Sequence, residues 1–251
     1  MALKLKWNRD PSVPFPNVWK TFTAPGLDAS KLQEYEIKEV TEDQFEEAFA
    51  LYVKVYLPNE PMSAALGMMN DRNSVEWFKK YAFSSVKQKM GLACFDTSTG
   101  KIVGVNFLYV LRKDDERVSD QLRALVPSDT VLRTWFDTIF IRNGGIDLFS
   151  KYDVDKILGS VALAIDPDYT KRGIAKEILM ARIPIGKAFG IRLTVSGFSS
   201  KYAIYIAQKL GYTFEQKITY KELAKLDPRF TPYNSLPDDC EYNTYQSFIL
   251  N

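Results

Sequence analysis

The sequence contains no histidine among its 251 residues. Histidine is the commonest general base near neutral pH and the commonest protein ligand of metal ions. Its absence excludes a Ser-His-Asp or Cys-His catalytic arrangement, and it excludes a zinc site of the usual histidine-rich kind. A general base in this chain must therefore be Asp, Glu, Lys, Tyr or Cys, or a water molecule held by one of them.

Cysteine and long apolar runs are also scarce. The two cysteines, Cys94 and Cys240, lie far apart and are too few for a four-cysteine metal site. A secreted disulfide scaffold would carry more cysteine, so we expect a reducing compartment and a cytoplasmic location. No run approaches the ~18 apolar residues of a membrane span. The first fifteen residues lack the apolar core of a signal peptide. We expect a monomer with no metal and no membrane partner.

Charge of one sign is not in excess either. The chain has 33 basic and 31 acidic residues, a formal net charge of +2. No large basic face is implied, which makes nucleic acid a poor candidate as partner. With 46% hydrophobic residues, the chain can bury a full core in one domain or in two small ones.

The first half of the sequence predicts helices around a hairpin. Residues 1–34 contain several prolines and are expected to form an irregular N-terminal extension. Residues 34–40 have the pattern of a strand, and Thr41 to Gln44 have the form of a capping box before a helix. We expect that helix to end within residues 57–61, Leu-Pro-Asn-Glu-Pro, where two prolines forbid continuation, and a second helix over 74–90. Residues 91–96 and 101–111 predict a β-hairpin.

The second half alternates between strands and helices. Residues 114–156 look mostly helical, with an interruption at Gly144-Gly145. The continuous apolar run 157–166 predicts a strand in the middle of a sheet. A helix is expected from about Gly173, kinked at Pro184. Further segments follow as a strand over 191–198, a helix over 199–211, and strands over 213–220 and 245–250. The order predicts a mixed α/β fold on a central sheet.

The stretch 166–179, DPDYTKRGIAKEIL, is a candidate anion site. The sequence lacks the P-loop pattern and the G-x-G-x-x-G pattern of dinucleotide sites. A helix that opens at Gly173 would still present unpaired N–H groups and the positive end of its dipole, and Lys171 and Arg172 add positive charge. The other interpretation is an ordinary strand-to-helix turn with a solvated basic pair.

The same stretch resembles the acetyl-CoA motif Q/R-x-x-G-x-G/A of the GCN5-related N-acetyltransferase (GNAT) superfamily. Gly173 and Ala175 match the motif, while Thr170 stands where Gln or Arg is usual. Residues 209–212, Lys-Leu-Gly-Tyr, match the end of a later helix of the superfamily. Ala207 stands where that helix often carries a tyrosine that acts as general acid.

Two further elements resemble insect arylalkylamine N-acetyltransferases. Glu60-Pro61 matches their E-P element, and Ser199-Ser200-Lys201-Tyr202 matches their Ser-Ser-x-Tyr. A second serine of that family is replaced by Ala203. The resemblance extends from about residue 34 to residue 251; it is strong over 157–215 and thin over 62–156. It implies a GNAT domain over residues 35–251, with a central twisted mixed sheet flanked by helices.

The resemblance also implies a reaction and a set of site residues. Acetyl-CoA would be the cosubstrate, and a small primary amine would attack it directly in a ternary complex. The amine would be an arylalkylamine such as dopamine or serotonin, or a polyamine such as agmatine. Glu60 would be the base, and Ser199 with Ser200 would assist the leaving thiolate. The cofactor would lie on the residues Leu163, Ala164, Ile165, Thr170, Lys171, Arg172, Gly173, Ile174 and Ala175.

Other interpretations stay open at this point. Glu60 before a proline can be a solvated turn residue, and a serine before a helix is usually an N-cap. Thr170, Ala203 and Ala207 lack typical family side chains, which keeps open a non-catalytic acyl-CoA sensor. A protein N-acetyltransferase would need an open groove, against which the long 114–156 segment argues weakly. A pocket lined by carboxylates would favour polyamines, and an aromatic pocket would favour arylalkylamines.

Overall fold

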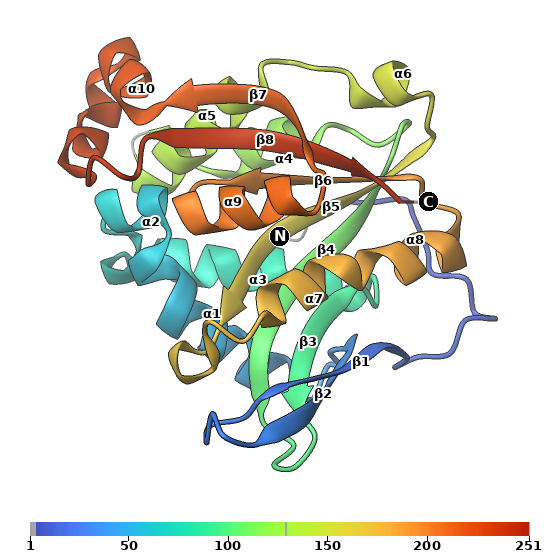
Figure 1. Cartoon of the computed structure of the whole chain (residues 1–251). Helices are drawn as coiled ribbons and strands as arrows, with labels where there is room; N and C mark the ends of the chain where they lie inside the picture. Colours follow the sequence, from blue (N-terminus) through green and yellow to red (C-terminus); the bar gives the residue numbers. More distant parts are fainter. Residues whose placement is uncertain (1–3, 129, 251) are drawn as a thin grey trace.

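The computed structural model describes residues 4–128 and 130–250, and of residues 119 and 123 the backbone alone. In this part of the chain an eight-stranded sheet has the order β1-β2-β3-β4-β5-β6-β8-β7 (Figure 1). The strands are β1 (Val18–Pro25), β2 (Leu32–Glu39), β3 (Gly91–Asp96), β4 (Ile102–Arg112), β5 (Lys156–Ile165), β6 (Leu193–Phe198), β7 (Thr213–Thr219) and β8 (Tyr242–Ile249). All neighbouring pairs are antiparallel except β5 and β6, so the predicted mixed sheet is confirmed.

Helices lie on both faces of this sheet. They are α1 (Phe45–Asn59), α2 (Pro61–Ala65), α3 (Arg72–Lys87), α4 (Val118–Leu125), α5 (Val131–Asn143), α6 (Leu148–Tyr152), α7 (Ile174–Met180), α8 (Arg182–Phe189), α9 (Lys201–Lys209) and α10 (Tyr220–Leu226). Short 3-10 turns are η1 (Met68–Asn70), η2 (Pro167–Tyr169) and η3 (Pro228–Ser235). No helix in the described ranges is long and apolar enough to cross a membrane.

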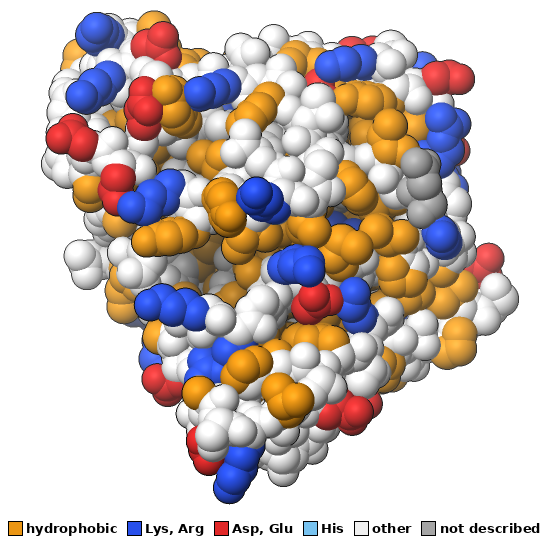
Figure 2. Space-filling model, viewed as in Figure 1, with side chains coloured by type: hydrophobic (Ala, Val, Ile, Leu, Met, Phe, Trp, Pro, Cys, Tyr) orange, Lys and Arg blue, Asp and Glu red, His pale blue; other side chains and the backbone are white. Residues whose placement is uncertain are grey.

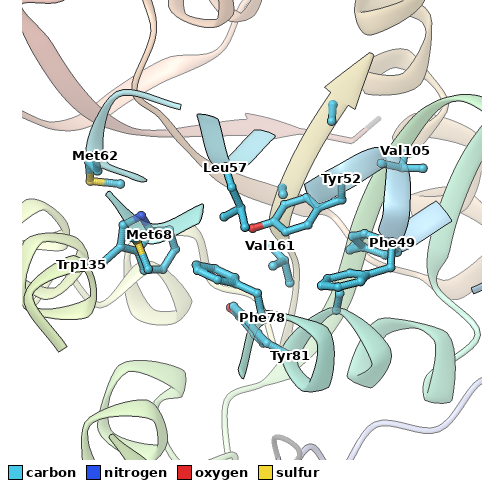
Figure 3. Close-up of a cluster of buried hydrophobic side chains, with 14 of the residues drawn as sticks. Phe49, Tyr52, Leu57, Met62, Met68, Phe78, Tyr81, Val105, Trp135 and Val161 are labelled. Atoms are coloured by element: carbon cyan, nitrogen blue, oxygen red, sulfur yellow. The ribbon is translucent and has the colours of Figure 1, made fainter. Parts of the chain in front are cut away.

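The core has two main layers, one on each side of the sheet. On one side, aromatic residues of α1 and α3 pack against β4 and β5, and Figure 3 shows Tyr52 and Phe78 around Val161. On the other side, Ile178 of α7 and Ile185 of α8 pack against the opposite faces of β3, β4 and β5. Because both faces are covered, β5 is apolar apart from Lys156 at its start and Ser160, which confirms the strand predicted for the middle of the sheet.

The sheet forks between β5 and β6. The two strands pair in parallel at Ile157 with Leu193 and at Leu158 with Thr194, and beyond these residues they diverge (Figure 1). On its other edge, β5 pairs with β4 along its full length, with a shift of register at Val161. Such a bulge bends the strand that carries it. The bend leaves one edge of β5, from Gly159 onward, without a strand partner.

The C-terminal end of α1 agrees with the prediction, and its N-terminal cap does not. The helix runs through Pro58 to Asn59 and so ends inside the expected stretch 57–61. A proline in the last turn removes one hydrogen bond, and the turn is closed by Glu60 N bonded to Tyr56 O at 2.7 Å. The capping box at Thr41 is also incomplete, because the N-cap is Gln44 and its side chain caps no helix N–H.

The N-terminal segment is more regular than the sequence indicated. Within the extension expected over residues 1–34, β1 pairs antiparallel with β2, and the predicted boundary at residue 34 falls inside β2. Arg9 Nη1 lies 2.8 Å from the buried Glu39 Oε1, and Trp7 is buried in the core. Strand β1 was not predicted from the sequence, because the segment contains several prolines and its strand structure depends on pairing with β2.

The helix after Gly173 is split one turn before Pro184. Helix α7 ends at Met180 and α8 begins at Arg182, with Ala181 between them still in the right-handed helical region. Pro184 has no N–H to donate to the carbonyl of Met180, which explains why the interruption precedes the proline. The predicted irregularity is thus present, as a break between two helices.

Candidate active site

A cavity of about 790 Å³ occupies the fork between β5 and β6. Its wall includes residues 159–165 of β5, residues 195–198 of β6, and Ser199 and Ser200 at the start of α9. The predicted residues Leu163, Ala164 and Ile165 therefore face the fork. On the surface near α7 and α9, exposed apolar side chains lie in the middle of the face, with Lys and Arg side chains around them (Figure 2).

A buried arginine ties the fork together. Arg182 is 1% exposed, and its Nη1 donates to Thr194 Oγ1 at 3.1 Å and to Ser196 Oγ at 2.8 Å in β6. Its Nη2 donates to Asn106 Oδ1 in β4, and the Asn106 amide donates to Ala162 O in β5 at 2.6 Å. Side chains therefore connect the three strands where the backbone ladder between β5 and β6 ends.

Glu60 lies at the cavity wall and also caps a helix. Its carboxylate accepts hydrogen bonds from the backbone N–H of Met62 at 3.2 Å and of Ser63 at 2.8 Å, the first residues of α2. Ser63 Oγ at 2.7 Å and Trp135 Nε1 at 3.4 Å donate to the same carboxylate. Glu60 is 5% exposed, so it is not the solvated turn residue of the alternative interpretation. These donors stabilise its negative charge.

The two serines differ in their roles. Ser200 is the N-cap of α9, since its Oγ accepts from the backbone N–H of Ala203 at 3.3 Å. The carbonyl of Ser199 accepts from the Tyr220 hydroxyl at 3.2 Å, while its own hydroxyl has no partner within the described chain. Both serines line the cavity. The N-cap interpretation therefore holds for Ser200 and does not hold for Ser199.

The loop before α7 and the start of that helix, residues 170–175, have a backbone shape that can bind an anion through N–H groups; we call this segment the cradle. Lys171 and Gly173 both have positive φ, 60° and 80°, and no atom lies within 4 Å of a Cβ built on Gly173. The first backbone bond of the helix is Glu177 N to Gly173 O, so the preceding N–H groups lack intrahelical acceptors. Thr170 and Ala175 line the cavity that also contains Glu60.

Two predicted cradle residues turn their side chains elsewhere. Arg172 Nε donates to Gly26 O at 3.0 Å, in the turn between β1 and β2. The side chain of Ile174 is 1% exposed and packs in the core beneath the sheet. Ile174 can therefore contribute to anion binding only through its backbone N–H, while the Arg172 guanidinium is held by backbone carbonyls and keeps its positive charge near the loop.

The half of the cavity away from the cradle is aromatic. Its wall includes Tyr56, Tyr81, Tyr109, Trp135, Phe136 and Tyr245. Burial raises the pKa of each of these four tyrosines, so their hydroxyls stay neutral near pH 7. The carboxylates on the whole wall are Glu60, Asp115 and Asp147 among the described residues. Aromatic side chains thus dominate over acidic ones.

A second buried arginine in the wall, Arg142, was missed by the sequence analysis, as was Arg182. Both lie on apolar helical stripes: Arg142 follows Trp135 and Ile139 at helical spacing, and Arg182 follows Ile178. An arginine at an apolar position of a helix indicates a buried polar or functional side chain, and this signal is visible in the sequence. Among the described residues no group of His, Cys, Asp and Glu is arranged to hold a metal ion.

Comparison with known proteins decides the family. The sequence matches no family model and no curated protein sequence. The structure matches a mosquito protein assigned as arylalkylamine N-acetyltransferase 7, from Aedes aegypti. The TM-score is 0.86 at 31% identity, and the match covers 98% of this chain and 100% of that one. The chain belongs to the arylalkylamine N-acetyltransferase family of the GNAT superfamily.

Solved structures of lower identity share the fold of this N-acetyltransferase. Arylalkylamine N-acetyltransferase 2 of Aedes aegypti matches with a TM-score of 0.77 at 16% identity, over 86% of this chain and 99% of that one. The polyamine N-acetyltransferase of Drosophila melanogaster, which forms N-acetylagmatine, matches with a TM-score of 0.69 at 16% identity, over 86% and 100%. The predicted GNAT fold is confirmed, and of these two neighbours one is named for arylalkylamines and the other for polyamines.

Proposed function

We propose that this enzyme transfers the acetyl group of acetyl-CoA to a small aromatic primary amine. The observation that carries the proposal is that one cavity is lined by Thr170 and Ala175 on either side of the Gly173 loop, by the unpaired edge of β5, by Glu60 and by aromatic side chains. A pocket lined by aromatic side chains favours arylalkylamines such as dopamine or serotonin, whereas a pocket lined by carboxylates would favour polyamines such as agmatine. Large aromatic side chains pack well against an aromatic ring of the substrate.

The cosubstrate would lie in the fork. The pantetheine arm would pair with the free edge of β5 near Leu163 and Ile165, taking the place of the strand that β6 no longer supplies. The pyrophosphate would bind the N–H groups of residues 171–175, and Gly173 leaves room for it. A backbone N–H of β5 would polarise the thioester carbonyl as negative charge develops on its oxygen.

The amine must lose a proton to become a nucleophile. An alkylammonium has a pKa of about 10, so only ~0.1% of it is neutral at pH 7. Glu60 would accept this proton, directly or through an ordered water, at the boundary between the aromatic wall and the fork. The neutral nitrogen then forms its bond to the acetyl carbon in the ternary complex, without an acyl-enzyme.

The carbon–sulfur bond breaks as the amide forms, and the second proton that the nitrogen loses passes, by way of a serine hydroxyl, to the departing thiolate. We propose Ser199 as the donor, because its hydroxyl has no partner within the described chain; the Ser200 side chain is held by the N-cap bond that it accepts, and its O–H stays available as a second donor. The hydrogen bond from Ser199 to the developing thiolate would make CoA a better leaving group. Both cysteines are free thiols, in keeping with a cytoplasmic location, which we also propose.

The test is an amine panel with acetyl-CoA and longer acyl-CoAs, in which the release of free thiol is followed. Turnover of arylalkylamines at a kcat/KM at least tenfold above that of agmatine and spermidine is expected. Faster turnover of the polyamines would contradict the choice of amine. Binding of acetyl-CoA without turnover of any amine would identify a non-catalytic acyl-CoA sensor, and the proposal would fail.

A further inference from the structure

Arg142 is a buried cation in the wall of the cavity, in the aromatic half where we propose that the amine binds. The side chain, from the end of α5, is 6% exposed. Its Nε donates to Asn143 Oδ1 at 3.0 Å and its Nη1 to Asn243 Oδ1 at 3.2 Å, and the guanidinium lies 5.6 Å from the centre of the Tyr245 ring. In the described part of the chain no carboxylate oxygen lies within 4.0 Å of its nitrogens.

The backbone of β6 makes room for this guanidinium. A Cβ built on Gly197 would lie 2.0 Å from Arg142 Nη1 and 2.6 Å from its Cζ. The cation therefore lies directly against the diverging strand that forms one side of the fork, a position that any larger residue at 197 would block. These hydrogen bonds use Nε and Nη1; within the described chain Nη2 has no hydrogen-bond acceptor and is not fully buried, and Arg142 lines the cavity.

A buried charge with no carboxylate in direct contact is costly, and burial lowers the pKa of Arg142, although Tyr245, Tyr56, Tyr220 and Glu60 nearby oppose this effect. A guanidinium nevertheless stays protonated in proteins. Glu60, the buried carboxylate of the same cavity, already accepts hydrogen bonds from the N-terminus of α2 and from Trp135. With Arg182 also buried in the wall, the interior of the cavity is better prepared for an anion than for a second cation.

We propose that Arg142 binds a carboxylate of the acceptor, so that the preferred substrates are aromatic amines that also carry an acidic group. Aromatic amino acids are the simplest members of this class. A guanidinium recognises a carboxylate through paired N–H donors, and the open Nη2 supplies such donors. A polyamine would place a second positive charge beside Arg142, and because like charges repel we expect polyamines to be poor substrates. This inference rests on the proposed amine acetylation.

The experiment compares neutral and acidic partners of the same aromatic amine. Tyramine is paired with tyrosine, and phenethylamine with 4-(2-aminoethyl)benzoate, each with acetyl-CoA. Because the carboxylate is attached at opposite ends of these molecules, at least one acidic partner should reach Arg142. We expect its kcat/KM to exceed that of the neutral partner at least tenfold.

Substitutions then test the residue itself. Arg142→Gln is expected to lower kcat/KM for the acidic substrate at least 100-fold, mainly through KM, and for the neutral partner less than threefold. Arg142→Lys should recover part of the loss, because it keeps the charge. Arg133→Gln is the matched control, since Arg133 lies in the same helix and its Nε pairs with Asp137 at 3.1 Å. It should leave the preference for the acidic substrate unchanged.

Three results would overturn the inference. The first is a neutral amine that is turned over as well as its acidic partner. The second is an equal effect of Arg142→Gln on both partners, which would mark a purely structural arginine. The third is a preference for succinyl-CoA over acetyl-CoA that depends on Arg142, which would assign the carboxylate to the acyl donor. Failure of the proposed function looks different, because no amine of either kind would release thiol.

Discussion

Arg182 Nη2 and Asn106 Oδ1 lie 2.9 Å apart, joined by a hydrogen bond across the base of the fork. Arg182 is the first residue of α8, Asn106 lies in the middle of β4, and both side chains are fully buried. The same asparagine donates to a carbonyl of β5, and the same arginine donates to two hydroxyls of β6. The opening between β5 and β6 is thus a hydrogen-bonded feature of the fold.

Replacing Asn106 with alanine should destabilise the protein. The substitution leaves Arg182 Nη2 and the carbonyl of Ala162 without their acceptor and donor, and each buried unsatisfied group costs roughly 1–3 kcal/mol. Urea unfolding followed by circular dichroism measures the loss. Asn70→Ala, at an exposed asparagine, should change the free energy of unfolding by less than about 0.5 kcal/mol. Equal stability of the two variants would mean that the network does not hold the fork.

Glu60 can be tested as a base separately from its role as a cap. Glu60→Gln should lower kcat/KM by about 10²–10⁴-fold, because the amide cannot accept the ammonium proton. Glu60→Ala should in addition lower the free energy of unfolding by about 1 kcal/mol, as expected for the loss of an N-cap. Steady-state kinetics and urea unfolding of both variants separate the two effects.

Asp71 offers the control for Glu60, since it is the acidic N-cap of α3 and lies away from the cavity wall. Asp71→Ala should lower stability by a similar amount and leave kcat/KM within about threefold of the wild type. If Glu60→Gln retains wild-type kcat/KM between pH 6 and 9, Glu60 is not the base.

Gly173→Ala should weaken acetyl-CoA binding more than it destabilises the protein. An alanine at φ 80° is strained by about 1 kcal/mol, and its methyl group would occupy the open space in front of the cradle. Gly67→Ala carries the same kind of strain, at φ 64° and also in open space, far along the chain from the cradle. Calorimetric titration with acetyl-CoA should show at least a tenfold higher Kd for Gly173→Ala only. An unchanged Kd would mean that the cradle is misplaced.

Stability at acidic pH should depend on Glu215 in β7. Burial raises the pKa of this carboxyl, but hydrogen bonds from Lys151, Ser247 and Tyr152 outweigh burial and hold it below its usual value. Its contribution is therefore present near neutral pH and is lost as the pH falls below the usual glutamate value of about 4.3. The difference in unfolding free energy between wild type and Glu215→Gln should shrink from pH 7 to pH 3. A constant difference would contradict this linkage.

The thiols of the folded protein should react slowly with thiol reagents. Burial, aided by the charge of Asp96, raises the pKa of Cys94 to about 12. Burial, aided by Glu60, raises the pKa of Cys240 to about 11, so at pH 8 only ~0.1% of it is thiolate. Labelling of Cys240 should accelerate about tenfold per pH unit, and both thiols should react rapidly in urea. Rapid labelling of the folded protein at pH 8 would contradict these environments.

The sequence predicted the elements whose partners are local or whose pattern is periodic. The apolar run of β5 predicted a central strand because burial on both faces leaves Ser160 as the one polar side chain over residues 157–165. Glu60 and Ser199 lie in the wall of one cavity, as the family resemblance implied, although nothing local connects them. The catalytic roles of these two residues stay predictions.

The buried arginines could not be predicted with the same ease. Arg142 is held by Asn243, 101 positions away, and Arg182 by Asn106, 76 positions away. A charge on an apolar stripe is acceptable only when such distant partners compensate it, and spacing along one helix does not reveal them. Strand β1 escaped prediction for a related reason, since its pairing with β2 decides its structure.

The order of strands at one side of the sheet restricts how the protein can assemble. Strand β8 lies between β6 and β7, although it follows both of them in the chain. Until β8 pairs with β6, β7 has no place in the sheet, and Asn243 and Tyr245 of β8 cannot reach the guanidinium beside Gly197. The amine side of the cavity should therefore become functional late in folding, by a long-range and comparatively slow pairing step.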